Sequence, residues 1–558
     1  IIVFLTFQFG IRQLLNDKNY FNDLPKNGKW AEGKIEKEQG KYDVIVLGEE
    51  PEGIAAALTA ARIGAKTLLI SEGDYLGGVV TRSLHASFEA AYGDGNELLN
   101  RGFFLELVKN LGEKFSVREY ESFVTDLIKK ETDLDIVYSA KVQSPVMEKG
   151  VITAIDVLVD GKKETYTGKR FIDATLGGDL LAMSGVPYFT GSKDINMPDY
   201  FVPVELNIVV SGINWDDIKY IFSTNLKDSF YSMIYEYIPQ DKQISIKDFD
   251  IIRQEDGKAI LQGITMRGVN IDNPEELKSA YQSAVKEAER FTQYLSSNLK
   301  PFKDSRLYNT ADEFYIREWR HFKGEYVLDV NEMIENKDWE YKIALGAYPI
   351  DAGKFVEGSS YIVGNPVQYA IPLGCIIPLG VDNLLMVGGK ISYSSLASTS
   401  AAVTGVNITT GESAGVVSVY SLVNGVTPRE ILNSEDDDDR ENLRALLERQ
   451  GVYIEDFEIP NINTQNWSYP AVRLLNRLGM VASGMDNNYG FETHARQQDL
   501  AVLLINGIYK LSTENYSMEL DKKIREYFIE DNLTPSKAAK ILTIFHGHTF
   551  SEDKVYSK

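Results

Sequence analysis

The sequence has almost no cysteine, few histidines and a shortage of positive charge. Cys375 is the one cysteine among 558 residues, which excludes an intrachain disulfide and a cysteine metal cluster. The five histidines are scattered, and the chain has no HExxH or CxxC motif, so we predict no metal site. A net charge of −23 disfavours nucleic acid and anionic membrane surfaces as partners. We therefore predict no nucleic-acid partner.

The chain also has no apolar run long enough to span a bilayer. Its first stretch, IIVFLTFQFGI, is uncharged up to Arg12, but about eleven residues are too few for a membrane span. Two alternatives remain open: the end of a signal or membrane anchor that begins before Ile1, or an amphipathic or disordered end. Residues 15–41 are polar without a period, so we assign 1–41 to an anchor remnant and a linker.

Residues 42–72 show the pattern of a βαβ unit. A buried strand (Val44 to Leu47) is followed by a turn, an Ala-rich helix from Gly53 to Gly64, and a second apolar strand (Thr67 to Ile70). Such a unit holds the ADP half of a dinucleotide, because the helix N-terminus offers free backbone N–H groups to the diphosphate. The sequence therefore predicts a parallel sheet with a dinucleotide-binding fold.

The turn of this unit, GEEPEG, departs from the dinucleotide fingerprint. That fingerprint has glycine at its first, third and sixth positions. Gly48 and Gly53 supply the first and the sixth, but Glu50 stands at the third, between Glu49 and Glu52. Three carboxylates repel a diphosphate, and the Cβ atom of Glu50 obstructs its close approach. We therefore expect the fold to form and a dinucleotide to be held weakly.

The rest of the chain alternates between helical and extended patterns. Apolar spacings of three and four predict helices at 97–112 and 119–133. Alternating residues predict a three-stranded antiparallel meander, and a long amphipathic pattern predicts a helix further on. The meander covers 136–142, 151–159 and 164–168 and leads into a strand that ends at Asp173, and the helix covers 274–295. An acidic run, Glu435 to Asp439, predicts a solvated linker before a helical tail.

This order of elements resembles the two-dinucleotide-binding-domain flavoproteins, and more narrowly a bacterial family of FAD-dependent oxidoreductases. The resemblance covers residues 42–425 and includes the helix TTGESAG (409–415). Five further segments carry it: YLGGVVT (75–81), FIDATLGGDLLAMSGVPY (171–188), YIREWRHFKGEYVL (315–328), IALGAYPID (343–351) and YAIPLGCIIPLGVDNLLMVGGKIS (369–392).

The resemblance implies an α/β fold class with four parts after the linker. A Rossmann-like FAD-binding domain with a β-meander is expected in two pieces, 42–190 and 345–425. An inserted α+β substrate domain (191–344) separates these pieces, and a helical domain (426–558) ends the chain.

The resemblance implies FAD as the cofactor and assigns a set of residues to it. In family terms these residues belong to the phosphate turn, the ribose, the glycine turn beside the flavin, the adenine and the flavin segments. They are Gly48, Gly53, Glu72, Gly77, Gly78, Thr81, Val142, Thr175, Asp179, Gly388 and Gly389.

Several of these segments depart from the family pattern on their ligand-facing side. Ser71 stands where the ribose-binding acid is expected, with Glu72 one residue later. The family's ATG-[DE], AGR and IPYR are ATLG (174–177), GGK (388–390) and IPLG (371–374) in this chain. The core-facing parts are kept, which suits a scaffold that folds normally while its cofactor contacts have changed.

On the substrate side, the resemblance points to Arg317, Arg320, Tyr348 and Asp351 as catalytic or substrate-binding residues, with His85 near the flavin ring. An Arg–carboxylate set of this kind can orient an anionic or hydroxylated substrate. We expect the first four residues to converge in one pocket. The alternatives are an inter-domain salt-bridge cluster and a packed histidine.

Residues 467–507 resemble one S-layer-homology unit, from Trp467 through Phe491, Arg496 and Asp499. This resemblance implies binding of cell-wall polymer and a location outside the cytoplasm, associated with the membrane or the cell wall. A helical packing domain in a cytoplasmic protein is the alternative.

Two functions follow as hypotheses. The first is an FAD-dependent oxidoreductase that transfers hydride to or from a small polar or saccharide-like molecule. The second is a non-catalytic cell-envelope protein on a degenerate flavoprotein scaffold that has lost tight FAD binding.

Overall fold

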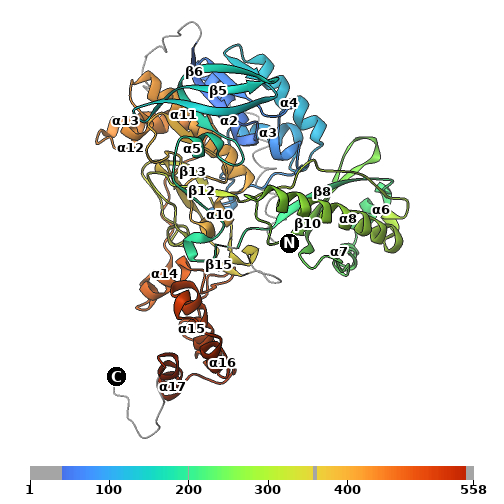
Figure 1. Ribbon diagram of the computed structural model, residues 1–558, viewed down its shortest axis with the longest axis vertical. Helices are drawn as coiled ribbons and strands as arrows, with labels where there is room; N and C mark the ends of the chain where they lie inside the picture. Colours follow the sequence, from blue (N-terminus) through green and yellow to red (C-terminus); the bar gives the residue numbers. More distant parts are fainter. Residues whose placement is uncertain (1–40, 199, 356–360, 548–558) are drawn as a thin grey trace.

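The computed structural model describes residues 41–198, 200–355 and 361–547. The predicted anchor remnant and linker lie, except for Lys41, outside the described residues. Figure 1 shows a sheet-centred body, an inserted domain at its side (green) and C-terminal helices (red) that extend away from it. Within the described ranges, no helix combines the length and apolar character needed to cross a bilayer.

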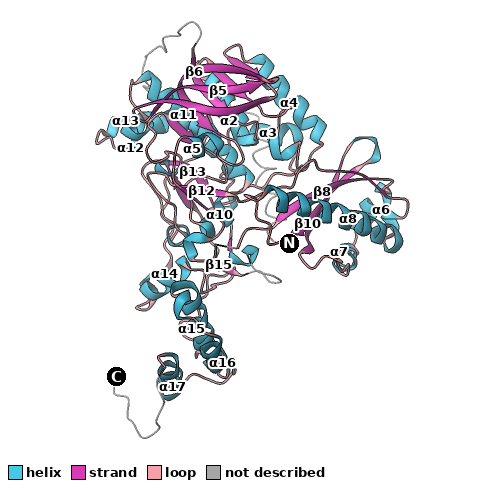
Figure 2. Ribbon diagram, viewed as in Figure 1, coloured by secondary structure: helices cyan, strands magenta, loops and turns pink. Residues whose placement is uncertain are grey.

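The body is built on a central sheet whose parallel strands follow the order β3-β2-β1-β6-β17. Figure 2 shows strands β5 and β6 of this sheet in magenta, with helices around them in cyan. Val44 of β1 lies beside Thr67 of β2, as the βαβ pattern predicts. The fold class is therefore α/β with a Rossmann-like core. The strands are β1 (Tyr42–Leu47), β2 (Thr67–Ile70), β3 (Leu134–Val137), β6 (Lys162–Asp173) and β17 (Leu384–Met386).

The predicted antiparallel meander is present, but its strands begin and end at other residues than predicted. The predicted strand 136–142 is split, because Ser139 adopts a left-handed conformation (φ 50°) between β3 and β4. The predicted third meander strand and the apolar strand after it form one long strand, β6. Its first half pairs antiparallel with β5 (Val151–Val159), which also pairs with β4 (Ala140–Glu148), and its second half pairs parallel with β1.

Helices cover this sheet and the loops around it. Helix α2 (Pro51–Arg62) follows β1 and packs against α11 (Thr404–Val423). The predicted helices near 97–133 are α3 (Phe103–Leu111) and α4 (Val117–Lys130), the second capped by the Ser116 hydroxyl. The shorter helices are α5 (Asp179–Met183), α9 (Val330–Ile334), α10 (Ser395–Ala401) and α12 (Pro428–Leu432).

The inserted segment forms an antiparallel sheet of order β11-β8-β10-β9 with its own apolar core. The predicted amphipathic helix is α8 (Pro274–Asn298), which buries Ala284, Phe291 and Leu295 in this core. The other elements are β8 (Val204–Ser211), α6 (Trp215–Phe222), α7 (Lys227–Tyr235), β9 (Ile244–Arg253), β10 (Ala259–Met266) and β11 (Arg306–Thr310).

Three pairs of short antiparallel strands lie where the inserted segment meets the body. The first two pairs join the inserted segment to the body, and the third lies within the body. The pairs are β7 (Tyr188–Thr190) with β12 (Arg320–Phe322), β13 (Lys342–Gly346) with β16 (Tyr369–Pro372), and β14 (Ile350–Asp351) with β15 (Ile362–Gly364).

The C-terminal part is helical, but the predicted linker at the acidic run is wrong. Helix α13 (Asp437–Arg449) begins inside that run, with Asp436 as its N-cap, because carboxylates are favourable at the positive end of a helix. Four helices follow: α14 (Tyr469–Arg477), α15 (Gln497–Leu511), α16 (Met518–Arg525) and α17 (Pro535–Phe545). The last three share a small core of Ala501, Ile505, Ile524 and Ile541.

Candidate functional site

Gly48 and Gly53 let the turn after β1 approach the end of β6. Gly48 has φ +103°, and a Cβ atom there would lie 2.4 Å from the carbonyl carbon of Ala174. A Cβ atom at Gly53 would lie 2.2 Å from the carbonyl oxygen of Gly48. Both glycines therefore serve the close packing of strand, turn and helix.

Glu50 fills the space in front of the N-terminus of α2. Its carboxylate is buried, accepts a hydrogen bond from the Val79 N–H (2.8 Å) and lies 3.3 Å from Nη2 of Arg82. A Cβ atom at Gly78 would lie 2.1 Å from the same carboxylate. The glycine turn that is expected to face a ligand phosphate therefore faces a carboxylate of the chain itself.

Glu49 extends this arrangement to the end of β2. Its Oε2 accepts the Glu72 N–H (3.1 Å), and its Oε1 lies 3.2 Å from Nη1 of Arg82. Arg82 also lies 3.3 Å from Glu313. We call Glu49, Glu50, Arg82 and Glu313 the acidic-turn cluster. Burial raises the pKa of Glu50 to about 8, despite the opposing effect of Arg82.

The Glu52 side chain lies against the segment GGK (388–390), which the resemblance assigns to the flavin. A Cβ atom at Gly388 would lie 2.2 Å from the Glu52 carboxylate. Burial raises the pKa of Glu52, while the nearby Lys390 lowers it. Burial in turn lowers the pKa of Lys390, whose Nζ donates to the Val387 carbonyl at 2.5 Å.

The cavity left between these groups is small. It measures about 50 Å³ and is bounded by Glu50, Glu52, Arg317, Trp319 and Lys390, among others. Binding sites for small molecules typically measure roughly 300–1,000 Å³. With Glu50 at the N-terminus of α2, the residues present do not fit the diphosphate of FAD in this arrangement.

The other residues that the sequence assigns to the cofactor lie around this region without forming an open site. Thr81 donates to the Gly78 carbonyl, and Gly77 donates to the Glu49 carbonyl. Glu72 forms an ion pair with Lys141 (3.1 Å). Val142 pairs with Val157 in the meander, and the Thr175 hydroxyl donates to Asp173 (2.7 Å). Asp179 begins α5 and lies 3.5 Å from Arg320. Gly389 lines the small cavity.

Arg317 lies on the other side of the cavity, where the inserted domain meets the body. Its guanidinium lies 3.9 Å from Glu89 of the body and 3.8 Å from Glu205 of β8. Both distances exceed a hydrogen bond, and within the described ranges its side chain donates none. Its side chain is 29% exposed. Burial raises the pKa of Glu205 to about 6, although Arg317 opposes this effect.

Aromatic and histidine rings line the approach to Arg317. His85 stacks on Tyr315 with ring centroids 4.0 Å apart, and the Arg317 guanidinium lies 5.2 Å from the centroid of the Tyr315 ring. Nδ1 of His85 lies 3.2 Å from Nε2 of Gln262, while its Nε2 is buried without a hydrogen-bond partner among the described residues. Burial lowers the pKa of His85 to about 4, so its ring is neutral at physiological pH.

Of the four residues expected to converge, Arg317 and Arg320 lie in different clusters. The charge of Glu89, together with burial, raises the pKa of Tyr348 to about 12, and Arg317 opposes this effect. Arg320 lies in a different cluster, 3.6 Å from Asp272 and donating to the Gly177 carbonyl (3.0 Å). Asp351 accepts the N–H groups of Gly353 and Tyr361 in its own turn.

The sequence-based analysis missed four members of this inter-domain site: Glu89, Glu205, Gln262 and Tyr315. Tyr315 opens the segment YIREWRHF and was detectable from its alternation with Arg317. The other three come from distant segments, and no local pattern distinguishes them from solvated polar residues.

A model of the family described as FAD dependent oxidoreductase matches residues 43–447. No curated protein matches the chain. Solved structures that resemble it include three with low identity. A geranylgeranyl bacteriochlorophyll reductase-like protein from Thermoplasma acidophilum is 13% identical (TM-score 0.35), with the match covering 87% of this chain and 99% of that one. The p-nitrophenol 4-monooxygenase PnpA from Pseudomonas putida is 8% identical (TM-score 0.36; 80% and 95% covered). The myxobacterial chondrochloren halogenase CndH is 11% identical (TM-score 0.35; 92% and 98% covered).

Proposed function

Because the chain belongs to the FAD dependent oxidoreductase family, we propose that it is an oxidoreductase that acts on a small polar organic molecule bearing carboxylate or hydroxyl groups, a class that includes saccharide-like compounds. The cofactor of this family is FAD, as the sequence predicts. The observation that supports this substrate class is the environment of Arg317.

The Arg317 guanidinium has hydrogen-bond donors to spare. It is held near two carboxylates at distances too long for hydrogen bonds, and it remains partly exposed. A planar fork of N–H donors in such a place suits bidentate binding of a carboxylate or a pair of hydroxyls. Neutral His85 is available nearby as a hydrogen-bond partner or proton acceptor.

The experiment is an anaerobic assay in which the protein, supplied with excess FAD, is mixed with a panel of hydroxy acids and sugar acids. We expect Arg317→Ala to raise KM at least about tenfold for the best substrate, because a charge-assisted bidentate contact is worth roughly 1.5–3 kcal/mol. Arg306→Ala, which removes an exposed arginine from β11, is the matched control and should leave KM unchanged. Equal KM values for the Arg317→Ala and wild-type proteins would refute the substrate assignment.

The Glu50 carboxylate favours a second candidate function. A non-catalytic cell-envelope protein could keep the flavoprotein scaffold after losing tight FAD binding. In that case the S-layer-homology-like unit, whose two helices are α14 and α15, binds cell-wall polymer outside the cytoplasm. The support for this alternative is that Val79 and Arg82 already bind a carboxylate where a diphosphate belongs.

Two measurements separate the candidates. The first is the absorbance of the purified protein between roughly 350 and 500 nm, where oxidised flavin absorbs. A yellow protein that keeps one FAD per chain through dialysis favours the oxidoreductase. A colourless protein that sediments with purified cell walls favours the envelope protein.

The second is an FAD titration of two variants at Glu50. The titration is done above pH 8, where the Glu50 carboxyl is ionised. There Glu50→Gln removes the charge and keeps the volume, whereas Glu50→Gly removes both. FAD binding gained by both variants identifies charge as the obstacle, and binding gained by Glu50→Gly alone identifies volume. If neither variant gains affinity over a colourless wild type, the scaffold has lost more than this turn.

A further inference from the structure

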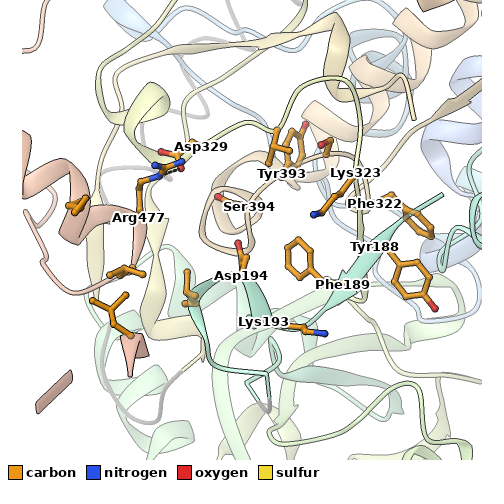
Figure 3. A pocket seen from close by; sticks show the side chains of 16 residues that line it. Tyr188, Phe189, Lys193, Asp194, Phe322, Lys323, Asp329, Tyr393, Ser394 and Arg477 are labelled. Atoms are coloured by element: carbon orange, nitrogen blue, oxygen red, sulfur yellow. Dashed lines mark hydrogen bonds and ion pairs between the residues drawn. The ribbon is translucent and has the colours of Figure 1, made fainter. Parts of the chain in front are cut away.

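A second, larger pocket lies between the body and the C-terminal helices. It measures about 740 Å³, within the range of small-molecule sites. Strands β7 and β12, the loop before α10, helix α14 and the end of α15 line it (Figure 3). We call it the β7–α14 pocket. It shares no lining residue with the cavity at Glu50 and Arg317.

Much of the pocket wall is apolar. Phe189 and Phe322 contribute from the strand pair, and Leu474, Leu478 and Leu511 contribute from the C-terminal helices. Leu474 and Leu511 are 61% and 63% exposed, so their side chains are accessible. A wall of this kind favours a ligand with an apolar body, since covering these side chains removes apolar surface from water.

The acidic groups of the pocket are already engaged by the chain. Asp194 accepts the N–H of Ser395 at the start of α10 (2.9 Å). Asp329 forms an ion pair with Arg477 (2.9 Å). These two carboxylates and the one arginine are therefore held in place by each other or by backbone groups.

The two lysines of the pocket are not engaged in this way. Lys193 and Lys323 line the pocket, and neither Nζ has a carboxylate or hydrogen-bond partner among the described residues. In the view of Figure 3 they lie on opposite sides of the Phe189 ring, and the Lys323 side chain reaches toward the interior. Both lysines are exposed residues, whereas the two carboxylates of the pocket already have partners in the chain.

We propose that the β7–α14 pocket binds an amphipathic organic anion. Its apolar body packs against Phe189, Leu474 and Leu511, its anionic group lies toward Lys323, and Lys193 adds positive charge on the other side of the Phe189 ring. Apolar contacts supply the larger share of the affinity, and the two lysines set the preference for negative charge. The proposal goes beyond the oxidoreductase function, because it involves none of the residues around Glu50 or Arg317 and needs no flavin.

The test uses the fluorescent anion anilinonaphthalene sulfonate and its neutral relative phenylnaphthylamine on the full chain. We expect one saturable site for the anion. Lys323→Glu and Lys193→Glu should each weaken its binding by about tenfold or more, since each turns an attraction into a repulsion. Binding of the neutral probe should stay within about twofold. Leu474→Ser should weaken both probes, because it removes apolar wall.

Lys278→Glu on α8 is the matched control, because it makes the same charge change at an exposed position of the inserted domain. It should leave the binding of both probes unchanged. The proposal is overturned if the anion shows no saturable binding, if the two pocket variants bind it like the wild type, or if Lys278→Glu weakens it equally.

Discussion

Glu50 lies where the positive end of helix α2 favours negative charge. In this chain the Glu50 carboxyl occupies that place, and the Val79 N–H and the Arg82 guanidinium hold it there. An incoming diphosphate must displace this carboxylate and also lies near Glu49 and Glu52. The obstacle from Glu50 is therefore steric at any pH, and it becomes electrostatic as well when the Glu50 carboxyl ionises near pH 8.

The buried carboxyl of Glu50 makes stability depend on pH. Its pKa rises from 4.5 to about 8 on folding, so between these values the folded protein keeps a proton that the unfolded chain has released. The free energy of unfolding therefore falls as pH rises through this window, and below it both states are protonated. Glutamine cannot ionise. We predict that Glu50→Gln gains stability relative to the wild type between pH 5 and pH 8, by on the order of 1 kcal/mol or more.

Urea denaturation of the two proteins at both pH values measures this difference directly. Titration of the other buried acids, such as Glu52 and Glu412, is common to both proteins and cancels to first order. A stability difference that is the same at both pH values would show that Glu50 does not titrate in this window.

Residue identity alone predicted part of this site. The sequence shows that Glu50 obstructs a diphosphate, but its partner Arg82 lies 32 residues away and no local pattern links them. The expectation that Arg317 and Arg320 share a pocket fails for a simpler reason. Residues three apart in an extended segment point to opposite sides, so the two guanidinium groups separate. Arg320 therefore faces Asp179 and Asp272.

Among the elements, α2 and α11 approach each other closely through two glycines of α11. A Cβ atom at Gly411 would lie 2.2 Å from the Glu52 carbonyl oxygen, and one at Gly415 would lie 2.6 Å from the Ala56 carbonyl oxygen. Because these neighbours are backbone atoms of a packed helix, they cannot move aside locally. The spacing of the two glycines therefore sets the distance between the helices that flank the acidic-turn cluster.

We predict that Gly415→Ala lowers the free energy of unfolding by about 1–3 kcal/mol, the usual cost of overpacking. Gly507→Ala in α15 is the matched control, since its added Cβ atom meets nothing closer than Met480 at 3.5 Å. Alanine favours helix over glycine by up to about 1 kcal/mol, so the control should be neutral or stabilising. Thermal denaturation of both variants tests this. A Gly415→Ala protein as stable as the control would mean that the helices can separate without loss.

The periodicity of apolar residues predicted most helices and strands of the body. It failed where contacts with distant parts of the chain determine where an element begins or ends. The strands β1 and β2 follow their patterns because they are buried on both faces and are continuous apolar runs, and the helix α8 follows its pattern because it buries one apolar face. Strand β6 serves two neighbours along its length, and a local pattern cannot show that change of partner. The acidic run is correctly predicted to be exposed to solvent. A helix nevertheless begins within it, since carboxylates in the first turn are favourable at a helix N-terminus.

At the scale of the whole molecule, the family match ends at residue 447. Beyond it the described chain continues through α14 to α15, α16 and α17, and these last three share a separate small core. Figure 1 shows α15, α16 and α17 extending away from the body. Their core contains four buried apolar residues, whereas the body and the inserted domain have large cores of their own. A unit that buries so little apolar surface opens at a low free energy.

We therefore predict that α15–α17 unfold before the rest of the chain. Backbone hydrogen exchange should show low protection in these helices and high protection in α2 and β1. Ile541→Ala removes a fully buried side chain of the small core and should cost about 2–5 kcal/mol there, enough to abolish protection throughout α15–α17 while leaving α2 unchanged. Leu542→Ala, at the adjacent position, which is 40% exposed, should change little. If Ile541→Ala lowers protection in α2 as much as in α15, the helices and the body form one cooperative unit. The β7–α14 pocket, which both parts line, would then be as rigid as the central sheet.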